Sequence, residues 1–485
     1  MKTTTRKSTY EKVMQMPKTK HRNPLRPLFL LQILIRVLSF FELLPLKVTI
    51  RKHAMEKIGK KEPCLILMNH SSFADLQIAS HIFFPKRYGI VTTTDGFVGP
   101  VMRLLMPLLG CIPTQKFVSD MGLIRDMQYM LKQKKTSVLM FPEAGYSFDG
   151  TATILPKKMG ILLKKLDVPV VTVITQGAYF RQPLYNDLQK RKTPIVADVT
   201  CLVTREELKT LSVAELDAKI EEAFSFDNFR WQQENQVVID EPFRADGLNR
   251  ILYKCPHCST EGKMEGKGIH LTCHQCGAQY ELTETGFLKA ENGVFNHVPF
   301  WYNWQRQEVR KELENGQYRL DVEVDIAMLV NYDALYMVGE GRLVHTEEGF
   351  RLTGCDGKLD YAQSPVASHT LNGDYFWYEI GDMIGIGNRD VLYYCFPKNC
   401  GDVVAKTRLA TEELYKMKKP ANPELRNKES APVDRGTFYL DREPRISRIL
   451  WQCSFSWRAR VWKMCPYWGS VCRASYWERQ RISRP

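Results

Sequence analysis

Short apolar segments that alternate with helical segments constrain the fold of this chain more strongly than any other feature. The apolar segments have the length of strands and cover residues 64–68, 136–141 and 168–174. The helical patterns between them cover residues 76–84, 123–132 and 157–166. Such alternation is typical of an α/β domain in which helices flank a largely parallel sheet. We expect this domain over residues 51–250, where capping-box patterns at Thr204 and Ser212 predict two further scaffold helices.

A histidine and an aspartate lie in the segment that joins the first strand to the first helix. His70 and Asp75 are five residues apart, which on a regular helix would set their side chains about 140° apart, so they can meet only across an irregular turn. If they meet, Asp75 orients one ring nitrogen of His70, and the other nitrogen accepts the proton of a hydroxyl during acyl transfer. The alternative is that His70 caps the helix as a core histidine.

Four sequence blocks follow one another in a fixed order around this pair. They cover residues 69–75, 110–116, 141–146 and 168–171. In order and rough spacing, over residues 50–180, they resemble the blocks of the glycerolipid acyltransferase family, in particular the lysophosphatidic acid (1-acylglycerol-3-phosphate) acyltransferases. The combination is much more specific than any single block.

The resemblance implies a reaction and a role for each block. His70 would be the base and Asp75 would orient it, while backbone amides near Gly145 are candidate oxyanion donors. Acceptor-binding residues would come from the second and third blocks: Lys116, Glu143, Gly145 and Tyr146. A fatty acyl group would pass from acyl-carrier protein or acyl-CoA to the hydroxyl of a lysophospholipid such as 1-acylglycerol-3-phosphate, in phospholipid biosynthesis and without a catalytic metal. The alternative for Lys116 and Glu143 is that they are solvated surface charges.

Two residues depart from the family pattern. Lys116 replaces the arginine of the second block, which keeps the charge but loses the planar fork that binds phosphate through two hydrogen bonds. Tyr146 replaces the arginine of the third block and keeps only a hydroxyl. The acceptor therefore has a different head group, or another cation such as Lys157 or Arg181 substitutes. Acylation of a different acceptor, an amine or a glycolipid, also stays open.

Two C-x2-C pairs predict a metal site. Their cysteines, separated by a 14-residue gap, are Cys255, Cys258, Cys273 and Cys276. This spacing is typical of a zinc ribbon, in which four thiolates complete a closed tetrahedral site. We predict a structural zinc ion in a small module over residues 251–284.

A rival hypothesis is a non-catalytic scaffold. Zinc ribbons occur in nucleic-acid machinery, and the formal charge of +14 suits either nucleic acid or an anionic membrane surface. The chain would then bind nucleic acid or a protein partner. The intact His70 and Asp75 argue against this hypothesis, and we do not expect a nucleic-acid partner.

Residues 285–420 are predicted to form a β-rich domain. Residues 318–326 alternate between apolar and polar, which predicts a half-buried strand, and residues 343–353 predict a hairpin. Further strands are expected over residues 374–380 and 391–396, and a helix over residues 403–418. Antiparallel strands followed by a helix resemble a pleckstrin-homology-like barrel.

The two ends of the chain differ in composition from the rest. Residues 1–50 combine a basic arm with an apolar segment over residues 28–46, in which Gln32, Arg36 and Ser39 form one polar stripe. We predict an amphipathic helix in an anionic membrane surface, at the cytoplasmic face, as a peripheral or monotopic attachment; the alternative is a helix packed on its own domain. Residues 421–485 are predicted to be a linker and an irregular basic aromatic tail, either a membrane anchor or the product of a shifted reading frame.

Overall fold

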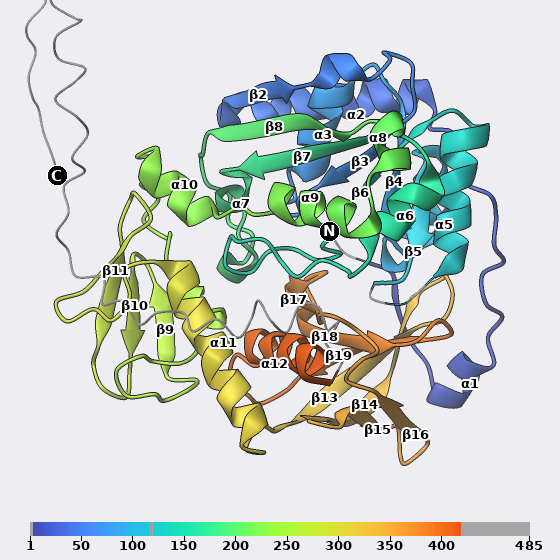
Figure 1. The fold of residues 1–485 in the computed structure, drawn as a ribbon. Helices are drawn as coiled ribbons and strands as arrows, with labels where there is room; N and C mark the ends of the chain where they lie inside the picture. The colour runs from blue at the N-terminus through green and yellow to red at the C-terminus, as the bar shows by residue number, and fades with distance from the viewer. Residues whose placement is uncertain (1–2, 117, 119, 419–485) are drawn as a thin grey trace, which may run out of the picture. The chain divides into compact units, whose positions relative to one another are not determined.

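The computed structural model describes residues 3–116, 118 and 120–418 (Figure 1). The described residues belong to one compact unit. The predicted linker and basic aromatic tail, residues 421–485, lie outside the described residues, so both interpretations of that tail stay open.

A seven-stranded sheet forms the centre of the region predicted to be α/β. Its strands are β2 (Val48–His53), β3 (Leu65–Met68), β4 (Tyr88–Thr93), β5 (Cys111–Thr114), β6 (Ser137–Met140), β7 (Val170–Gln176) and β8 (Ile195–Val203). They are ordered β2-β8-β7-β3-β6-β4-β5. From β7 to β5 all neighbours pair in parallel, whereas β8 runs antiparallel to β7. The predicted, largely parallel sheet is confirmed.

Helices cover both faces of this sheet because its central strands are apolar on both sides. In β3, Leu65 and Leu67 join one core while Ile66 and Met68 join another, as the alternation of side chains along a strand requires. The first core includes side chains of α5 (Met121–Gln128), α6 (Met159–Leu166) and α9 (Val213–Ala223). The second includes side chains of α2 (Phe29–Leu43) and α3 (Asp75–Phe83). The remaining helices of this region are α4 (Pro100–Leu108), α7 (Ala178–Arg181), α8 (Arg205–Thr210) and α10 (Asn228–Glu234).

Both predicted capping boxes are present. Thr204 accepts the N–H of Glu207 at the start of α8, and Ser212 accepts the N–H of Glu215 at the start of α9. Each glutamate returns a hydrogen bond to the backbone of its capping residue, so both helices begin where the sequence predicted.

The cysteine-containing module is a small antiparallel sheet. Its strands are β9 (Met264–Lys267), β10 (His270–Cys273), β11 (Gln279–Leu282) and β12 (Leu288–Lys289). They are ordered β12-β11-β10-β9, and the β9–β10 hairpin occupies the gap between the cysteine pairs. Helix α11 (Val298–Glu314) packs on the module through Trp301, which is buried and donates its indole N–H to the carbonyl of Lys254 at 2.9 Å.

The C-terminal region is a second large antiparallel sheet followed by a helix. Its strands are β13 (Leu320–Leu329), β14 (Leu335–Thr346), β15 (Gly349–Gly354), β16 (Leu359–Gln363), β17 (Asn372–Trp377), β18 (Gly381–Gly387) and β19 (Leu392–Pro397), and the helix is α12 (Val404–Lys418). The order β16-β15-β14-β13-β19-β18-β17 joins a four-stranded and a three-stranded meander. The glycine-rich β18 was not predicted, because glycine has low strand propensity.

The basic N-terminal arm contributes to this second sheet. Strand β1 (Thr5–Lys7) pairs in parallel with β14, and Val13 of α1 (Tyr10–Met14) is fully buried in the same core. No local pattern in residues 1–26 indicates this pairing, which joins residues more than 300 positions apart.

The apolar segment after the arm forms α2, continued by a single turn at Leu44–Leu46. Phe29–Leu46 is long and apolar enough to cross a membrane, by length and composition alone. The orientation of α2 is inverted relative to a soluble amphipathic helix: Ser39 is buried, whereas Leu30, Leu38 and Phe41 are 60–79% exposed. Its polar stripe therefore turns toward the protein and its apolar face turns outward.

Candidate active site

Loops from neighbouring strands meet at one edge of the seven-stranded sheet. Because β3, β6, β4 and β5 are adjacent and parallel, the residues that follow each of them reach the same edge. His70 follows β3, Lys116 follows β5, and Tyr146 lies in the loop after β6. The first three sequence blocks are brought together in this way.

His70 and Asp75 form a hydrogen-bonded pair, as predicted. His70 Nδ1 lies 3.0 Å from Asp75 Oδ2, and the same oxygen accepts the backbone N–H groups of Ser71 and Ser72 at 2.9 and 3.0 Å. These two bonds fold the chain into the irregular turn that the five-residue offset requires, before α3 begins at Asp75. The Nδ1 bond leaves Nε2 as the proton acceptor, and the His70 side chain is 18% exposed, enough to reach a substrate.

Asn69, the first residue of the block, anchors the turn to the sheet. Its Nδ2 donates to the carbonyl of Thr175 at 3.0 Å and to Ser71 Oγ at 2.9 Å, and its Oδ1 accepts the N–H of Thr175 at 2.8 Å. Thr175 lies in β7, so this buried asparagine fixes the end of β3 to its neighbour. We assign it a positioning role.

Glu143 lies beneath the histidine instead of at its surface. Its Oε2 accepts the backbone N–H of His70 at 2.8 Å, and its Oε1 accepts the N–H of Thr153 at 2.9 Å. The residue is fully buried, and burial raises the pKa of its carboxyl to about 7. A side chain in this position cannot contact an acceptor, so the role predicted for Glu143 becomes one of positioning His70.

The turn that carries Glu143 is held in an unfavourable backbone conformation. Ala144 has a φ of 54°, in the left-handed region that costs an alanine about 1–2 kcal/mol. The turn is fixed from the other side because Ser147 donates its N–H to the carbonyl of His70 at 3.1 Å. The first and third blocks therefore hold each other in place, and Gly145 lies half-buried between these contacts.

Two aromatic rings enclose the imidazole of His70. The ring of Phe141 lies 4.1 Å from it and that of Tyr146 lies 3.7 Å from it, between centroids, and Phe73 stacks on the outer side of Tyr146 at 4.9 Å. Burial lowers the pKa of His70, the hydrogen bond that His70 donates to Asp75 opposes this, and the charge of Lys116 lowers the pKa further. The imidazole is therefore kept neutral, which is the form that can act as a base.

The pH dependence of acyl transfer should follow this histidine. Because only neutral His70 accepts a proton, kcat/KM is expected to rise with pH through the His70 pKa and to level off below the ordinary histidine value of about 6.5. The measurement is kcat/KM between about pH 5 and pH 8, with circular dichroism at each pH as a check on folding. A midpoint clearly above 6.5 would contradict the assignment, and Lys116→Gln should move the midpoint upward because it removes a positive charge.

The cations near the site are distributed differently from the family pattern. Lys116 is half-buried and lies close enough to His70 to affect its pKa. Arg181 is one of the two cations that could replace the missing arginine of the third block. It is buried, and it donates to the carbonyl of Arg191 at 2.7 Å and to Glu42 at 3.1 Å. Lys157 is exposed. Of these substitutes, Arg181 is occupied by structural contacts and is not available to an acceptor.

The C-terminal sheet and helix reach the same edge, which no sequence signal indicated. Arg408 of α12 donates to the carbonyl of Tyr146 at 3.0 Å, so the C-terminal helix holds the loop that covers His70. Tyr378, beyond β17, donates its hydroxyl to Asp95 at 3.0 Å. These contacts join segments about 260 to 280 residues apart, so neither periodicity nor motif spacing could have revealed them.

The four cysteines of the second motif converge. Their Sγ atoms all lie within 4.8 Å of one another, with 3.7 Å between Cys255 and Cys276 and 3.8 Å between Cys258 and Cys273. Four sulfurs at about 2.3 Å from a tetrahedral zinc ion lie about 3.8 Å apart, so the donor set fits zinc. The two histidines inside the motifs bond elsewhere: His257 to Tyr280 and His274 to Glu265.

Known proteins resemble part of this chain. A protein-family model described as Acyltransferase matches residues 49–176, which contain the His70–Asp75 pair and the third block. Among solved structures, the 1-acyl-sn-glycerophosphate (LPA) acyltransferase PlsC of Thermotoga maritima is similar at 18% identity and a TM-score of 0.33, over 40% of this chain and 76% of that one. No curated protein matches the chain.

Proposed function

We propose that this chain, whose residues 49–176 belong to the acyltransferase family, moves a fatty acyl group from a thioester to the hydroxyl of a lysophospholipid such as 1-acylglycerol-3-phosphate. The donor would be acyl-carrier protein or acyl-CoA, and the product would enter phospholipid biosynthesis. The observation that carries the proposal is the His70–Asp75 pair at the sheet edge, inside the matched residues.

The reaction follows from the groups at this edge. His70 Nε2 removes the proton of the acceptor hydroxyl, and the oxygen attacks the thioester carbonyl to form a tetrahedral oxyanion. The oxyanion collapses, the carbon–sulfur bond breaks, and the departing thiolate takes the proton from His70. We propose the backbone N–H of Gly145 as an oxyanion donor because it lies in the loop beside His70.

The test is a direct assay of acyl transfer. Labelled acyl-CoA and labelled acyl-carrier protein are each incubated with the full chain and a panel of lysophospholipids, and the diacyl product is quantified by mass spectrometry. Reactions without acceptor count thioester hydrolysis separately. A diacyl product from either donor supports the proposal, and its absence with every acceptor and both donors overturns it.

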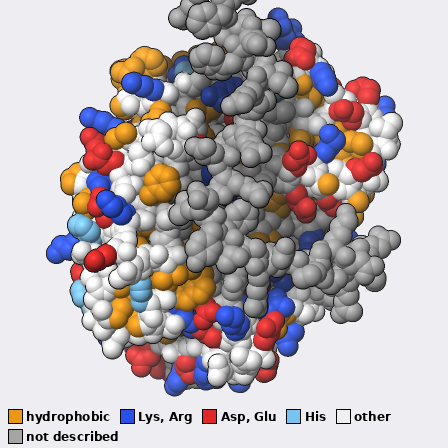
Figure 2. Space-filling view, turned by 60° about the vertical axis from the view of Figure 1, so that its left-hand side comes forward, with side chains coloured by type: hydrophobic (Ala, Val, Ile, Leu, Met, Phe, Trp, Pro, Cys, Tyr) orange, Lys and Arg blue, Asp and Glu red, His pale blue; other side chains and the backbone are white. Residues whose placement is uncertain are grey.

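The scaffold alternative is not favoured by these observations. The family match and the intact His70–Asp75 pair both indicate chemistry. On the face shown in Figure 2, Lys and Arg side chains are interspersed with Asp and Glu, whereas a nucleic-acid surface concentrates positive charge.

We also propose that α2 attaches the protein to an anionic membrane surface on its cytoplasmic face. The support is the outward apolar face of α2, together with Val101 and Leu104 of α4, which are 70% and 69% exposed. In addition, Arg36 Nη1 is buried without a hydrogen-bond partner among the described residues, so the polar stripe does not face water. This arrangement suits a helix that lies in the interface.

Replacing Leu38 and Phe41 together with serine should weaken vesicle binding by at least about tenfold, because each apolar side chain contributes to burial in lipid. The measurement is co-sedimentation with vesicles of phosphatidylcholine and phosphatidylglycerol. Ile161→Ser with Val238→Ser is the matched control, since both residues are exposed and apolar but lie outside α2 and α4. Equal binding by the two double variants would contradict the attachment.

For the appended regions we propose a structural zinc ion and a pleckstrin-homology-like barrel. The sulfur separations support the first, and the two meanders followed by α12 support the second. The cysteines would hold the ion in a closed site, which supplies stability and no open position for chemistry.

A further inference from the structure

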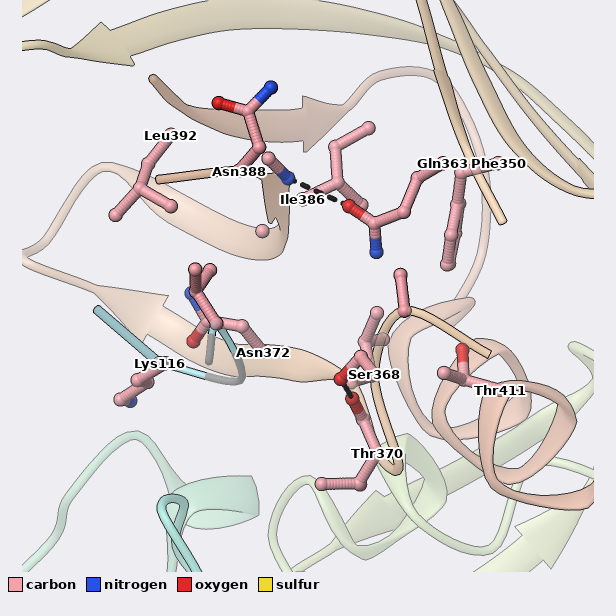
Figure 3. A pocket seen from close by; sticks show the side chains of 15 residues that line it. Lys116, Phe350, Gln363, Ser368, Thr370, Asn372, Ile386, Asn388, Leu392 and Thr411 are labelled. Carbon is pink, nitrogen blue, oxygen red and sulfur yellow. Dashed lines mark hydrogen bonds between the residues drawn. The ribbon is translucent and has the colours of Figure 1, made fainter. Parts of the chain in front are cut away.

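A cavity with both polar and apolar lining lies where the second sequence block meets the C-terminal sheet. Its volume is about 170 Å³. Lys116 lies at its margin beside Asn372, with the end of the side chain turned away from the other labelled residues, and Gln363 and the exposed Asn388 lie on another side (Figure 3). Pockets that enclose a drug-sized ligand have roughly 300–1,000 Å³, so this cavity suits a small group and not a whole lipid.

Side-chain nitrogen atoms with N–H hydrogens still able to donate hydrogen bonds line this cavity. Among the described residues, no hydrogen bond or ion pair engages Lys116 Nζ or the amide of Asn372. Gln363 and Asn388 use only their oxygens, which accept the N–H groups of Gly387 at 2.9 Å and Val391 at 3.2 Å. Each of these amides keeps a free NH2 group, so the cavity offers donors to a ligand that presents oxygen atoms.

Hydroxyl groups supply the complementary acceptors. Thr411 donates to the carbonyl of Thr407 at 2.8 Å, Thr370 donates to Glu412 at 2.6 Å, and Ser368 donates to the carbonyl of Thr370. Because each hydroxyl hydrogen is already used, their oxygens are left to accept hydrogen bonds from a ligand. Donors and acceptors side by side fit a ligand with several hydroxyl groups.

The charge of the residues that line the cavity narrows the class of ligand further. Lys116 is the one charged residue in the lining, and no carboxylate is part of it. A phosphate monoester carries about −1.5 to −2 charges at pH 7, which one lysine does not neutralise. A phosphodiester carries a single negative charge and is matched by one lysine.

The cavity adjoins the candidate active site. Lys116 follows β5 and His70 follows β3, at the same edge of the sheet. Tyr146 occupies the position where the family has an arginine, so the third block offers no side-chain cation to the acceptor. A head group that extends from the acceptor hydroxyl would instead reach Lys116 and the amides of the C-terminal domain.

We propose that this cavity binds the head group of the acceptor, and that the preferred acceptor is a lysophospholipid with an anionic phosphodiester and a hydroxyl-bearing head, such as lysophosphatidylglycerol. Lys116 pairs with the phosphodiester, and the amides of Asn372 and Asn388 donate to the head-group hydroxyls. This inference rests on the proposed acyl transfer and narrows its substrate class.

The kinetic test compares three acceptors with the full chain. Lysophosphatidylglycerol is expected to exceed lysophosphatidic acid in kcat/KM by about tenfold or more, and to exceed lysophosphatidylcholine, whose head lacks hydroxyls. Asn372→Ala should bring the ratio between lysophosphatidylglycerol and lysophosphatidic acid close to one. Asn292→Ala, which changes an exposed asparagine outside the cavity, should leave the ratio as in the wild type.

A second variant tests whether a changed ratio in Asn372→Ala reflects misfolding. In Gly385→Ala the new Cβ would lie 2.4 Å from Asn372 Nδ2, so the amide must leave its place although its chemistry is unchanged. This variant should reduce the same ratio, with the unfolding temperature recorded for both variants. An unchanged ratio in both folded variants, or a wild-type preference for lysophosphatidic acid, would overturn the inference.

Binding without turnover separates this inference from the proposed function. Glycerophosphoglycerol, the water-soluble deacylated head group, is titrated calorimetrically against glycerol 3-phosphate. Tighter binding of glycerophosphoglycerol that Asn372→Ala abolishes supports the cavity even if no acceptor is acylated, and only the proposed reaction then fails. Acylation of lysophosphatidic acid without binding of glycerophosphoglycerol keeps the reaction and refutes the cavity.

Discussion

Replacing His70 with alanine is expected to lower kcat/KM for acyl transfer by about 10²- to 10⁴-fold, the range in which a positioned general base contributes. The variant removes the group that we place to take the acceptor proton, and Asp75 cannot replace it, since Asp75 is 1% exposed and its Oδ2 is engaged by three N–H groups. Asp75→Asn should be comparably impaired, because an amide presents either a weaker acceptor or an extra donor to Nδ1 and the two backbone N–H groups.

Two controls make this expectation specific. His53 and Asp198 form another histidine–aspartate pair, at 3.2 Å, but it is exposed and lies on β2 and β8, outside the edge that carries His70. His53→Ala should therefore keep nearly wild-type activity. His70→Gln keeps much of the volume between Phe141 and Tyr146, so its unfolding temperature tests whether lost activity reflects lost structure. Activity of His70→Gln and His70→Ala within about tenfold of the wild type would rule out the base assignment.

Removing the proposed zinc ion is expected to cause the largest loss of stability. Structural zinc binds peptides with apparent free energies of about 10–16 kcal/mol, and without it the buried thiols of Cys255 and Cys273 lose the ion around which they converge. The module shares one core with the rest of the chain, since Tyr280 and Trp301 belong to the same cluster as Phe148 and Tyr375. Its unfolding should therefore spread beyond residues 251–284.

The zinc experiment pairs metal content with thermal unfolding. Zinc per chain is measured by mass spectrometry for the wild type, for Cys273→Ser and for Cys400→Ser, where Cys400 is an exposed free cysteine outside the cluster. The wild type and Cys400→Ser should hold one zinc ion per chain and unfold together, whereas Cys273→Ser and chelator-treated wild type should unfold at a clearly lower temperature. A wild type without zinc, or a Cys273→Ser variant with unchanged stability, would refute the structural role.

Several features were determined by the sequence itself because their physical cause is local. The apolar run of β3 is buried on both faces, so it needs no partner to be identified as a strand. The cysteine spacing encodes a small loop that brings four thiols together, and the capping boxes at Thr204 and Ser212 form within four residues. The pairing of His70 with Asp75 was predictable as a possibility, since the turn between them is short.

Other features were decided only by tertiary structure. The sequence shows that α2 has a polar stripe but not which side the protein covers, and Ser39 proves to lie inward. The family resemblance implied an acceptor-binding role for Glu143, yet the residue is buried and its carboxylate accepts the backbone N–H groups of His70 and Thr153. Arg408 of α12 and Asn372 of β17 come from the C-terminal region to the neighbourhood of the edge that carries His70. These placements depend on which distant elements pack together. The free energy of that packing comes from the shape and burial of side chains over the whole unit. It therefore produces no local periodicity that could be found in the sequence.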